Sequence, residues 1–266
     1  MYKFIAVDMD GTLLNSKGEI DPLTKKAILA AKKRGVLVTI STGRPIQGVR
    51  KYIQELEITA PVITYNGAVI VDPKKDQILY QKGLSKEDAR QVIEEGLSRK
   101  VSLILWAKNA LYVNRIDENV KKYQQLSGNT PIIVENYDKI IELGITKILW
   151  IDEADTIKKY REALATTIRK SVHYCTSKTT FLEFFDAGVS KADALEYIRK
   201  EYRMSRQEMI AIGDGYNDLS MIEYAGLGVA MGNAESGVKR RADFVTKSND
   251  ENGIAHVINR FVIQRV

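Results

Sequence analysis

The stretch Phe4-Ile5-Ala6-Val7-Asp8-Met9-Asp10-Gly11-Thr12 decides the fold of this chain. Its first four residues are apolar and predict a buried strand, and two carboxylates follow where that strand ends. Because strand residues alternate sides, Asp8 and Asp10 are expected to point the same way, and Gly11 permits a sharp turn after them. Carboxylates in this position indicate a site for a divalent metal together with a phosphate group.

Strands and helices alternate along the residues that follow. Asp21-Pro22 supplies a helix N-cap and a first-turn proline, and Gly35 supplies the stop for that helix. We expect a second strand at 36–41, a helix from 45 to about 55 and a third strand at 61–64. This order of elements predicts a parallel sheet with right-handed crossovers.

The same alternation returns near the C-terminus, after a middle segment with a different order of elements. The late elements are expected as helices at 191–202, 218–224, 236–241 and from 253, and as strands at 209–212, 227–230 and 244–246. The middle segment is expected to hold helices at 86–99, 118–126 and 154–168 and strands at 101–107, 111–113, 146–151, 172–175 and 181–185. The sequence therefore predicts an α/β core formed by residues 1–83 and 187–266, with an α+β domain inserted at 84–186.

Composition describes an ordinary globular protein and excludes several classes. The single cysteine, Cys175, rules out an internal disulfide and is expected to be a small core residue on a strand rather than a nucleophile. No apolar stretch approaches the ~20 residues of a membrane span, so we expect a cytoplasmic protein without membrane contact. The net charge of +6 comes from scattered basic clusters without an accompanying aromatic-basic motif, so no nucleic-acid partner is expected.

Polar residues follow four of the predicted strands, at the point where each strand ends. They are Asp8, the run Ser41-Thr42-Gly43-Arg44, the run Tyr65-Asn66-Gly67-Ala68 and the run Gly213-Asp214-Gly215-Tyr216-Asn217-Asp218. In a parallel sheet, ligands bind beyond the carboxyl ends of the strands. These residues are therefore expected to form one site.

Four motifs, in order, make the chain resemble the haloacid dehalogenase superfamily of phosphotransferases, specifically its Cof-type, sugar-phosphatase-like branch with a C2-type α/β cap. The motifs are Asp8-Met9-Asp10-Gly11-Thr12-Leu13-Leu14, Ser41-Thr42-Gly43-Arg44-Pro45, Gly188-Val189-Ser190-Lys191 and Gly213-Asp214-Gly215-Tyr216-Asn217-Asp218. The resemblance implies a Rossmann-like core and a cap between the second and third motifs. It also implies a Mg²⁺-dependent hydrolase that removes phosphate from small phosphorylated metabolites, sugar phosphates above all, through an aspartyl-phosphate.

The resemblance also implies a role for each motif residue. Asp8 is expected to be the nucleophile and a metal ligand, and Asp10 the general acid and base, with its main-chain carbonyl on the metal. The third metal ligand is expected to be Asp214, supported by Asp218, while Lys191 neutralises the charge at the reacting centre. The remaining expected phosphate-binding residues are Met9, Thr42, Gly43 and Asn217.

Some residues keep two interpretations. Arg44, Asn66 and Gly67 are candidates for substrate contact but are equally well explained as structural turns. In the inserted domain, Lys108, Arg115, Lys147 and Glu183 are candidates for contact with the leaving group. Ala192 departs from the family, in which a glycine commonly follows the lysine.

Two other functions stay open at this point. One is a phosphomutase of the phosphomannomutase type, since that enzyme shares the core motifs, and the other is a regulatory metabolite-binding protein without turnover. No coiled-coil heptads are present, so a monomer is the default expectation and a weak dimer the alternative.

Overall fold

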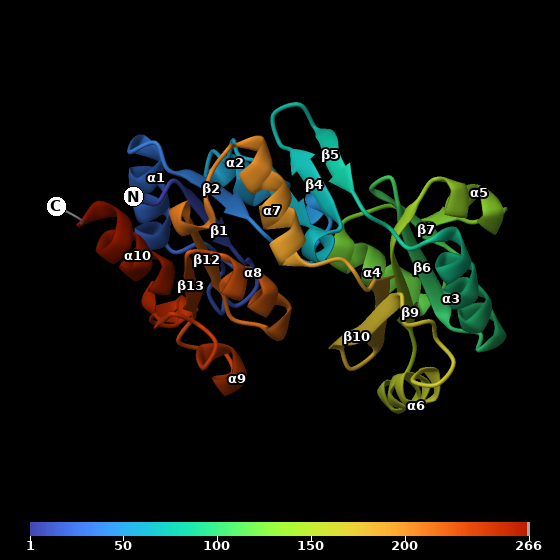
Figure 1. Cartoon of the computed structure of the whole chain (residues 1–266). Helices are drawn as coiled ribbons and strands as arrows, with labels where there is room; N and C mark the ends of the chain where they lie inside the picture. Colours follow the sequence, from blue (N-terminus) through green and yellow to red (C-terminus); the bar gives the residue numbers. More distant parts are fainter. Residues whose placement is uncertain (265–266) are drawn as a thin grey trace. The chain divides into compact units, whose positions relative to one another are not determined.

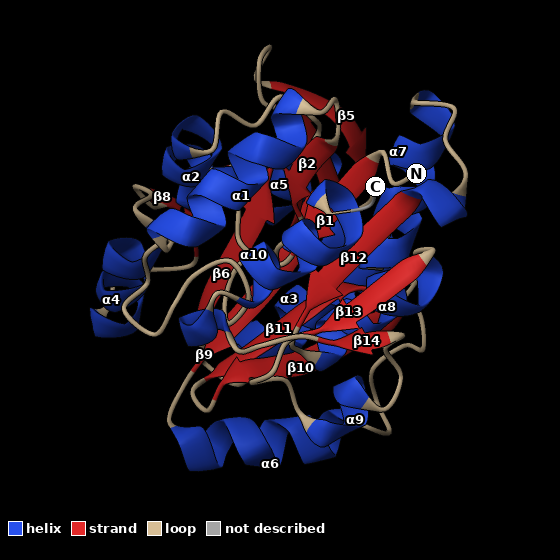
Figure 2. Ribbon diagram, turned by 90° about the vertical axis from the view of Figure 1, so that its left-hand side faces the viewer, coloured by secondary structure: helices blue, strands red, loops and turns tan. Residues whose placement is uncertain are grey.

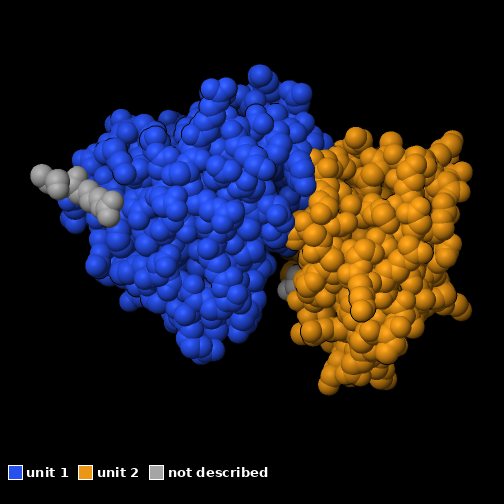
Figure 3. Space-filling model, viewed as in Figure 1, with its two compact units in different colours: residues 1–44, 49–80, 190–266 blue, residues 45–48, 81–189 orange. Residues whose placement is uncertain are grey.

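The computed structural model describes residues 1–264, and the chain divides into two compact units (Figure 3). Unit 1 contains Met1–Arg44, Val49–Tyr80 and Ser190–Val266, and unit 2 contains Pro45–Gly48 and Gln81–Val189. The short segment Pro45–Gly48 thus groups with unit 2, whereas the sequence-based division leaves it in the core. A function of unit 2 as a cap stays a prediction.

A parallel five-stranded sheet forms the centre of unit 1 (Figures 1 and 2). Its order is β14-β13-β12-β1-β2, and every neighbouring pair is parallel. The strands are β1 (Phe4–Val7), β2 (Leu37–Ile40), β12 (Met209–Gly213), β13 (Leu227–Ala230) and β14 (Phe244–Val245). The predicted α/β fold with a parallel core sheet is therefore confirmed.

Both faces of this sheet are buried. Phe4 and Ala6 belong to an apolar cluster that also contains Ala194 and Leu195 of α7. Alternation sends Ile5 to the opposite face, where it is also fully buried. Strands buried on both faces read as continuous apolar runs, as the sequence of β1 does.

Six α-helices belong to the described part of unit 1. They are α1 (Pro22–Lys33), α2 (Arg50–Glu55), α7 (Lys191–Glu201), α8 (Leu219–Tyr224), α9 (Ser236–Lys239) and α10 (Gly253–Ile258). The start of α1 follows the expectation, since Asp21 accepts a hydrogen bond from the Leu23 amide and Pro22 is the first helical residue. The helix expected over 45–55 is instead divided into a 3₁₀ turn at Ile46–Gly48 and α2.

The third predicted strand does not extend the parallel sheet, and this expectation was wrong. β3 (Val62–Thr64) pairs antiparallel with β4 (Val69–Asp72), and β5 (Gln77–Gln81) completes a separate three-stranded sheet. Only one parallel bridge, Ser41 to Ile63, joins β3 to the strand end beside it. That bridge still brings the turn after β3 close to the end of β2.

Unit 2 is an α+β unit built on a six-stranded sheet of order β10-β11-β9-β6-β7-β8. Its pairs are antiparallel except for β7 with β8. The strands are β6 (Ser102–Ala107), β7 (Ala110–Val113), β8 (Ile132–Ile133), β9 (Ile145–Ile151), β10 (Val172–Lys178) and β11 (Phe181–Asp186), and the helices are α3 (Lys86–Ser98), α4 (Glu118–Ser127), α5 (Tyr137–Glu142) and α6 (Ala154–Leu164). Apolar residues of α3, α5 and α6 join one face of this sheet in a single core, which contains Val92, Trp150 and Ile157.

Among the described helices, none has the length and apolar character needed to cross a membrane.

Candidate active site

The site lies in unit 1, where neighbouring parallel strands end. β12, β1 and β2 pair in register, so the residues after them emerge at one edge of the sheet. Asp8 follows β1, Ser41 follows β2, and Asp214 follows β12. This is the edge at which α/β sheets bind ligands, and the sequence expectation of a shared rim is met for these three strand ends.

A fully buried lysine forms the centre of the site. Lys191 is the first residue of α7, after the N-cap Ser190, and its side chain is 0% exposed. Its ammonium donates to Asp8 Oδ1 at 2.5 Å, to Asp218 Oδ1 at 2.6 Å and to the Ser41 main-chain carbonyl at 2.7 Å. An ammonium has three N–H groups, so all of its donors are satisfied. A positive charge at a helix N-terminus opposes the helix dipole, and the two carboxylates offset this cost.

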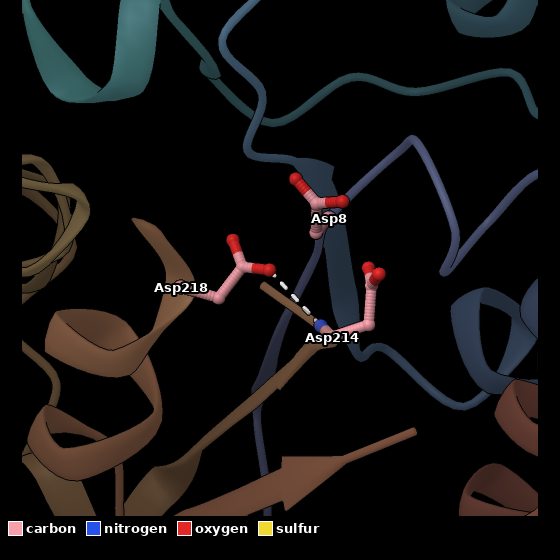
Figure 4. Close-up of side chains that lie close together, drawn as sticks. All are labelled: Asp8, Asp214 and Asp218. Carbon is pink, nitrogen blue, oxygen red and sulfur yellow. Dashed lines mark hydrogen bonds between the residues drawn. The ribbon is translucent and has the colours of Figure 1, made fainter. Parts of the chain in front are cut away.

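Three carboxylates lie close together at this site, those of Asp8, Asp214 and Asp218 (Figure 4). One oxygen each from Asp8, Asp214 and Asp218 lie within 4.8 Å of one another. Burial raises the pKa of Asp8 to about 8, helped by the nearby charge of Asp218 and opposed by Lys191. Burial likewise raises the pKa of Asp214 to about 6, against a hydrogen bond from Thr12.

The donor set of this cluster fits a divalent cation. Three carboxylates lie near one ammonium, so the fully ionised cluster carries excess negative charge. Burial, and to a smaller extent the charge of Asp218, raises the pKa of Asp8 and of Asp214. Oxygen ligands are those that Mg²⁺ prefers, and a bound cation would reverse this tendency to protonate. Asp8 and Asp214 are the residues able to hold it, since Asp218 uses both of its oxygens elsewhere.

Asp218 shapes the loop after β12. Its Oδ2 accepts hydrogen bonds from the amides of Asp214 at 3.0 Å and Gly215 at 2.9 Å, and its Oδ1 accepts from Lys191. The first of these bonds is drawn in Figure 4. The residue therefore fixes the position of Asp214 and the orientation of Lys191 together, consistent with the supporting role expected for it.

Thr12 is a site residue that was not predicted. Its hydroxyl donates to Asp214 Oδ1 at 2.6 Å and orients that carboxylate. The side chain is buried, although threonine is a polar residue in a turn. Gly11 beside it has φ +82°, and a Cβ there would lie 2.4 Å from Asp214 Oδ2, so glycine is required for the close approach. The spacing of Asp8, Gly11 and Thr12 in the first motif was the available signal.

Asp10 does not share the surroundings of Asp8, contrary to the alternation argument. β1 ends at Val7, and the main chain then turns, with the Leu13 amide donating to the Asp8 carbonyl. The Asp8 side chain is 7% exposed, whereas that of Asp10 is 59% exposed and forms a two-pronged ion pair with Arg44. Period-two alternation applies only inside a strand, which is why the expectation failed.

The other predicted phosphate-binding residues surround the same edge. Thr42 is buried and its hydroxyl accepts from the Arg44 amide at 3.1 Å, while Met9 is fully buried. Asn217 donates to the Asn66 side chain at 3.2 Å. A Cβ on Gly43 would lie 3.1 Å from the Asn66 amide, so Gly43 allows this close packing.

Gly67 has a packing function. Its φ is +107°, and a Cβ there would lie 2.2 Å from the Ser190 carbonyl oxygen. The turn after β3 therefore lies directly against the start of α7, which carries Lys191. This supports the structural interpretation of Gly67, one of the two that the sequence left open.

Three of the four candidates in unit 2 have partners within that unit. Lys147 and Glu183 form a buried ion pair at 3.2 Å, with side chains 8% and 12% exposed. Arg115 pairs with Asp117 at 2.7 Å, and Lys108 lies in the turn between β6 and β7 with φ +48°. Their predicted contact with a leaving group stays a prediction.

The chain is similar to known proteins over almost its whole length. Residues 5–258 match the family of haloacid dehalogenase-like hydrolases. YxeH of Bacillus subtilis, which carries a provisional phosphatase name, is 33% identical over 270 residues and covers 100% of both chains. The 5-amino-6-(5-phospho-D-ribitylamino)uracil phosphatase YcsE of the same organism is 33% identical over 263 residues, which are 98% of this chain and 96% of that protein.

A solved structure extends the similarity to three dimensions. The haloacid dehalogenase subclass IIB sugar phosphatase BT4131 superimposes with a TM-score of 0.81 at 25% identity, over 98% of this chain and 99% of that one. The family match and these phosphatases confirm the predicted superfamily and the predicted enzyme class. The chain belongs to the haloacid dehalogenase-like hydrolase family.

Proposed function

We propose that this protein is a Mg²⁺-dependent phosphatase that hydrolyses small phosphorylated metabolites through an aspartyl-phosphate on Asp8. The observation that supports this most strongly is the different hydrogen bonding of the two oxygens of the Asp8 carboxylate. Its Oδ1 is held by Lys191, and among the described side chains none donates to its Oδ2. One oxygen is thus oriented while the other is available for attack.

In the first step, Asp8 Oδ2 attacks phosphorus, the bond from phosphorus to the leaving oxygen breaks, and that oxygen takes a proton from Asp10. In the second step, water gives a proton back to Asp10 and attacks phosphorus, which releases phosphate and the free Asp8 carboxylate. A carboxylate that switches from acid to base in this way serves both half-reactions.

Other residues of the rim stabilise charge. Lys191 offsets the negative charge shared between Asp8 and the transferred phosphoryl group. The hydroxyl of Thr42, the amides of Met9 and Gly43 and the side chain of Asn217 are proposed to donate to phosphoryl oxygens.

Asp8, the Asp10 main-chain carbonyl and Asp214 are the proposed Mg²⁺ ligands, with Asp218 holding the loop that carries Asp214. The chemistry that Mg²⁺ supplies when bound is polarisation of phosphoryl oxygens and neutralisation of the excess carboxylate charge. The cluster of three carboxylates, of which Asp8 and Asp218 are buried and Asp214 is half-buried, supports this assignment.

The substrate class is proposed from the named relatives. One acts on a phosphate carried by a ribityl chain and another is a sugar phosphatase. Both names describe a phosphate on a polyhydroxylated carbon chain, so we propose sugar phosphates and related polyol phosphates as substrates. The monomeric state and the cytoplasmic location expected from the sequence stay predictions.

Phosphate release from p-nitrophenyl phosphate and from a panel of sugar and polyol phosphates tests this proposal. We expect release that requires Mg²⁺, stops with a chelator and falls by more than about 1,000-fold in Asp8→Asn, because the amide is a poor nucleophile. The variant Asp76→Asn, at an exposed carboxylate, is the matched control. Full activity of Asp8→Asn, or full activity in chelator, would contradict the proposal.

A further inference from the structure

Asp10 has a fixed main chain but an exposed side chain. The turn that carries it is closed by two bonds, from Leu13 to the Asp8 carbonyl at 3.1 Å and from Leu14 to the Met9 carbonyl at 3.0 Å. Its carboxylate is 59% exposed and is not one of the three that lie close together at the site. An exposed carboxylate of this kind has several staggered rotamers open to it unless a partner selects one.

Arg44 is that partner. Its Nε donates to Asp10 Oδ2 at 2.9 Å, and its Nη2 donates to Asp10 Oδ1. Two parallel bonds between a planar guanidinium and a planar carboxylate fix both the position and the plane of the carboxylate. A lysine at this position would offer a point charge without that directional fork.

The main chain of Arg44 is itself held on both sides. Its amide donates to the Thr42 hydroxyl at 3.1 Å, and its carbonyl accepts from the Tyr65 amide at 3.3 Å. The Thr42 amide in turn donates to the Ile63 carbonyl at 2.9 Å. The guanidinium therefore extends from a main chain that is tied to the end of β2 and to β3.

We propose that Arg44 is a positioning residue for Asp10, which sets the direction in which that carboxylate presents its oxygen to the leaving group. This rests on the proposed function, in which Asp10 is the general acid and base. It replaces the substrate contact for which Arg44 was a candidate, because the Nε and Nη2 donors that face Asp10 are both occupied by its carboxylate.

A positioning arginine differs from a phosphate-binding or purely structural one in how its loss depends on the leaving group. Proton donation matters most when the leaving oxygen is strongly basic, and it matters little when the leaving group is already a stable anion. Loss of the positioning residue should therefore slow esters with basic leaving groups more than esters with acidic ones. The value of kcat/KM reports this, because it covers the steps up to the first phosphoryl transfer.

The experiment compares wild type, Arg44→Met and Arg44→Lys on phenyl phosphate, p-nitrophenyl phosphate and 2,4-dinitrophenyl phosphate, in Mg²⁺. We expect kcat/KM of Arg44→Met to fall by about 30-fold on phenyl phosphate and by less than about 3-fold on 2,4-dinitrophenyl phosphate, within the range of general acid catalysis. Arg44→Lys should resemble Arg44→Met, since it keeps the charge and loses the fork.

The matched control is Arg50→Met. Arg50 also forms an exposed ion pair in unit 1, in which its Nη2 donates to both carboxylate oxygens of Asp76, at 2.8 and 2.9 Å. The side chain of Arg50 is 47% exposed and that of Arg44 is 37% exposed. Arg50→Met therefore removes an exposed ion pair without touching Asp10. We expect its kcat/KM to match that of wild type on all three esters.

A second comparison uses Asp10→Asn and the double variant Asp10→Asn with Arg44→Met. If Arg44 acts through Asp10, the double variant is no slower than Asp10→Asn on phenyl phosphate. An equal fall of kcat/KM on all three esters in Arg44→Met, mainly through KM, would assign Arg44 to phosphate binding and overturn the proposal. Unchanged kinetics would overturn it as well, whereas failure of the proposed function would appear in wild type as no Mg²⁺-dependent release from any ester.

Discussion

At the scale of single residues, the chemistry depends on buried charges of opposite sign that stabilise one another. Lys191 is 0% exposed and keeps its ammonium bonded to two carboxylates and one carbonyl. The oppositely charged partners hold the pKa of Lys191 above its ordinary value despite burial. The motif predicts that Lys191 and Asp8 meet, but not that Asp218 bonds the same ammonium, because the loop after β12 sets that contact.

Replacement of Lys191 tests this balance. We expect Lys191→Met to lower the free energy of unfolding by about 3 kcal/mol or more, because two buried carboxylates lose their cation. Urea unfolding measures the change. Lys25→Met, at an exposed pair with Glu55, should cost less than about 1 kcal/mol. A stability of Lys191→Met within 1 kcal/mol of wild type would contradict the importance of the lysine for the cluster.

Cys175 allows a prediction of pH dependence. Burial raises the pKa of its thiol to about 11, with the nearby Glu183 adding to the effect. The thiolate is the reactive form, so at pH 8 only roughly one molecule in a thousand carries it, and the fraction rises as pH rises toward 11.

Alkylation by iodoacetamide under native conditions, followed by mass spectrometry, measures this. We expect the rate of Cys175 alkylation in the native protein to increase about tenfold per pH unit between pH 8 and pH 10. In urea, where the thiol is no longer buried, we expect a fast reaction. A rate that levels off near pH 9, as for an exposed thiol, would contradict the assigned burial effect.

At the scale of elements, the sequence predicts strands and helices wherever local signals and burial agree. β1, β2, β12 and β13 have apolar runs, and α1 has a capping aspartate and a first-turn proline. The prediction from sequence fails for β3. A short run such as Val62–Thr64 can pair parallel or antiparallel, and in the structure it pairs antiparallel with β4. The prediction that Asp10 points the same way as Asp8 also fails, because the strand ends before either residue.

The contact between the turn after β3 and α7 predicts a difference between two glycines. Gly67→Ala should lower the free energy of unfolding by about 3 kcal/mol, because the new Cβ would meet the Ser190 carbonyl and the residue keeps a positive φ. Gly18→Ala is the matched control, since Gly18 has φ +76° with nothing within 4 Å, and should cost about 1 kcal/mol. Equal losses in urea unfolding would show that the close contact is unimportant.

At the scale of the whole molecule, the residues assigned to catalysis lie in one unit, and the sequence of the other unit says less about function. Every motif residue assigned to the phosphoryl group lies in unit 1, at the strand ends of one sheet and, for Lys191, at the start of α7. Lys147 and Glu183 of unit 2 were candidates for contact with the leaving group, and that contact stays a prediction. Their ion pair depends on the register of β9 and β11, which the sequence does not reveal. The substrate therefore could not be predicted from the sequence in the same detail as the residues that act on the phosphoryl group.

Metal binding should be visible in the stability of the whole molecule. Because the three-carboxylate cluster exists only in the folded state, Mg²⁺ at saturating concentration and constant ionic strength should raise the Tm of wild type by a few degrees. We expect Asp214→Asn to lose most of this increase and Asp76→Asn to keep it, by differential scanning fluorimetry. An equal increase in wild type and Asp214→Asn would place the cation elsewhere.

Transfer of the phosphoryl group through Asp8 can be observed directly. Wild type and Asp8→Asn are mixed with a sugar phosphate that wild type hydrolyses, quenched in acid during turnover, digested and analysed by mass spectrometry. We expect the wild-type peptide containing Asp8 to gain the mass of one phosphoryl group, located on Asp8, and the Asp8→Asn peptide not to gain it. A phosphoryl group found on another residue, or none on Asp8 in an enzyme trapped with its second step slowed by Asp10→Asn, would contradict it.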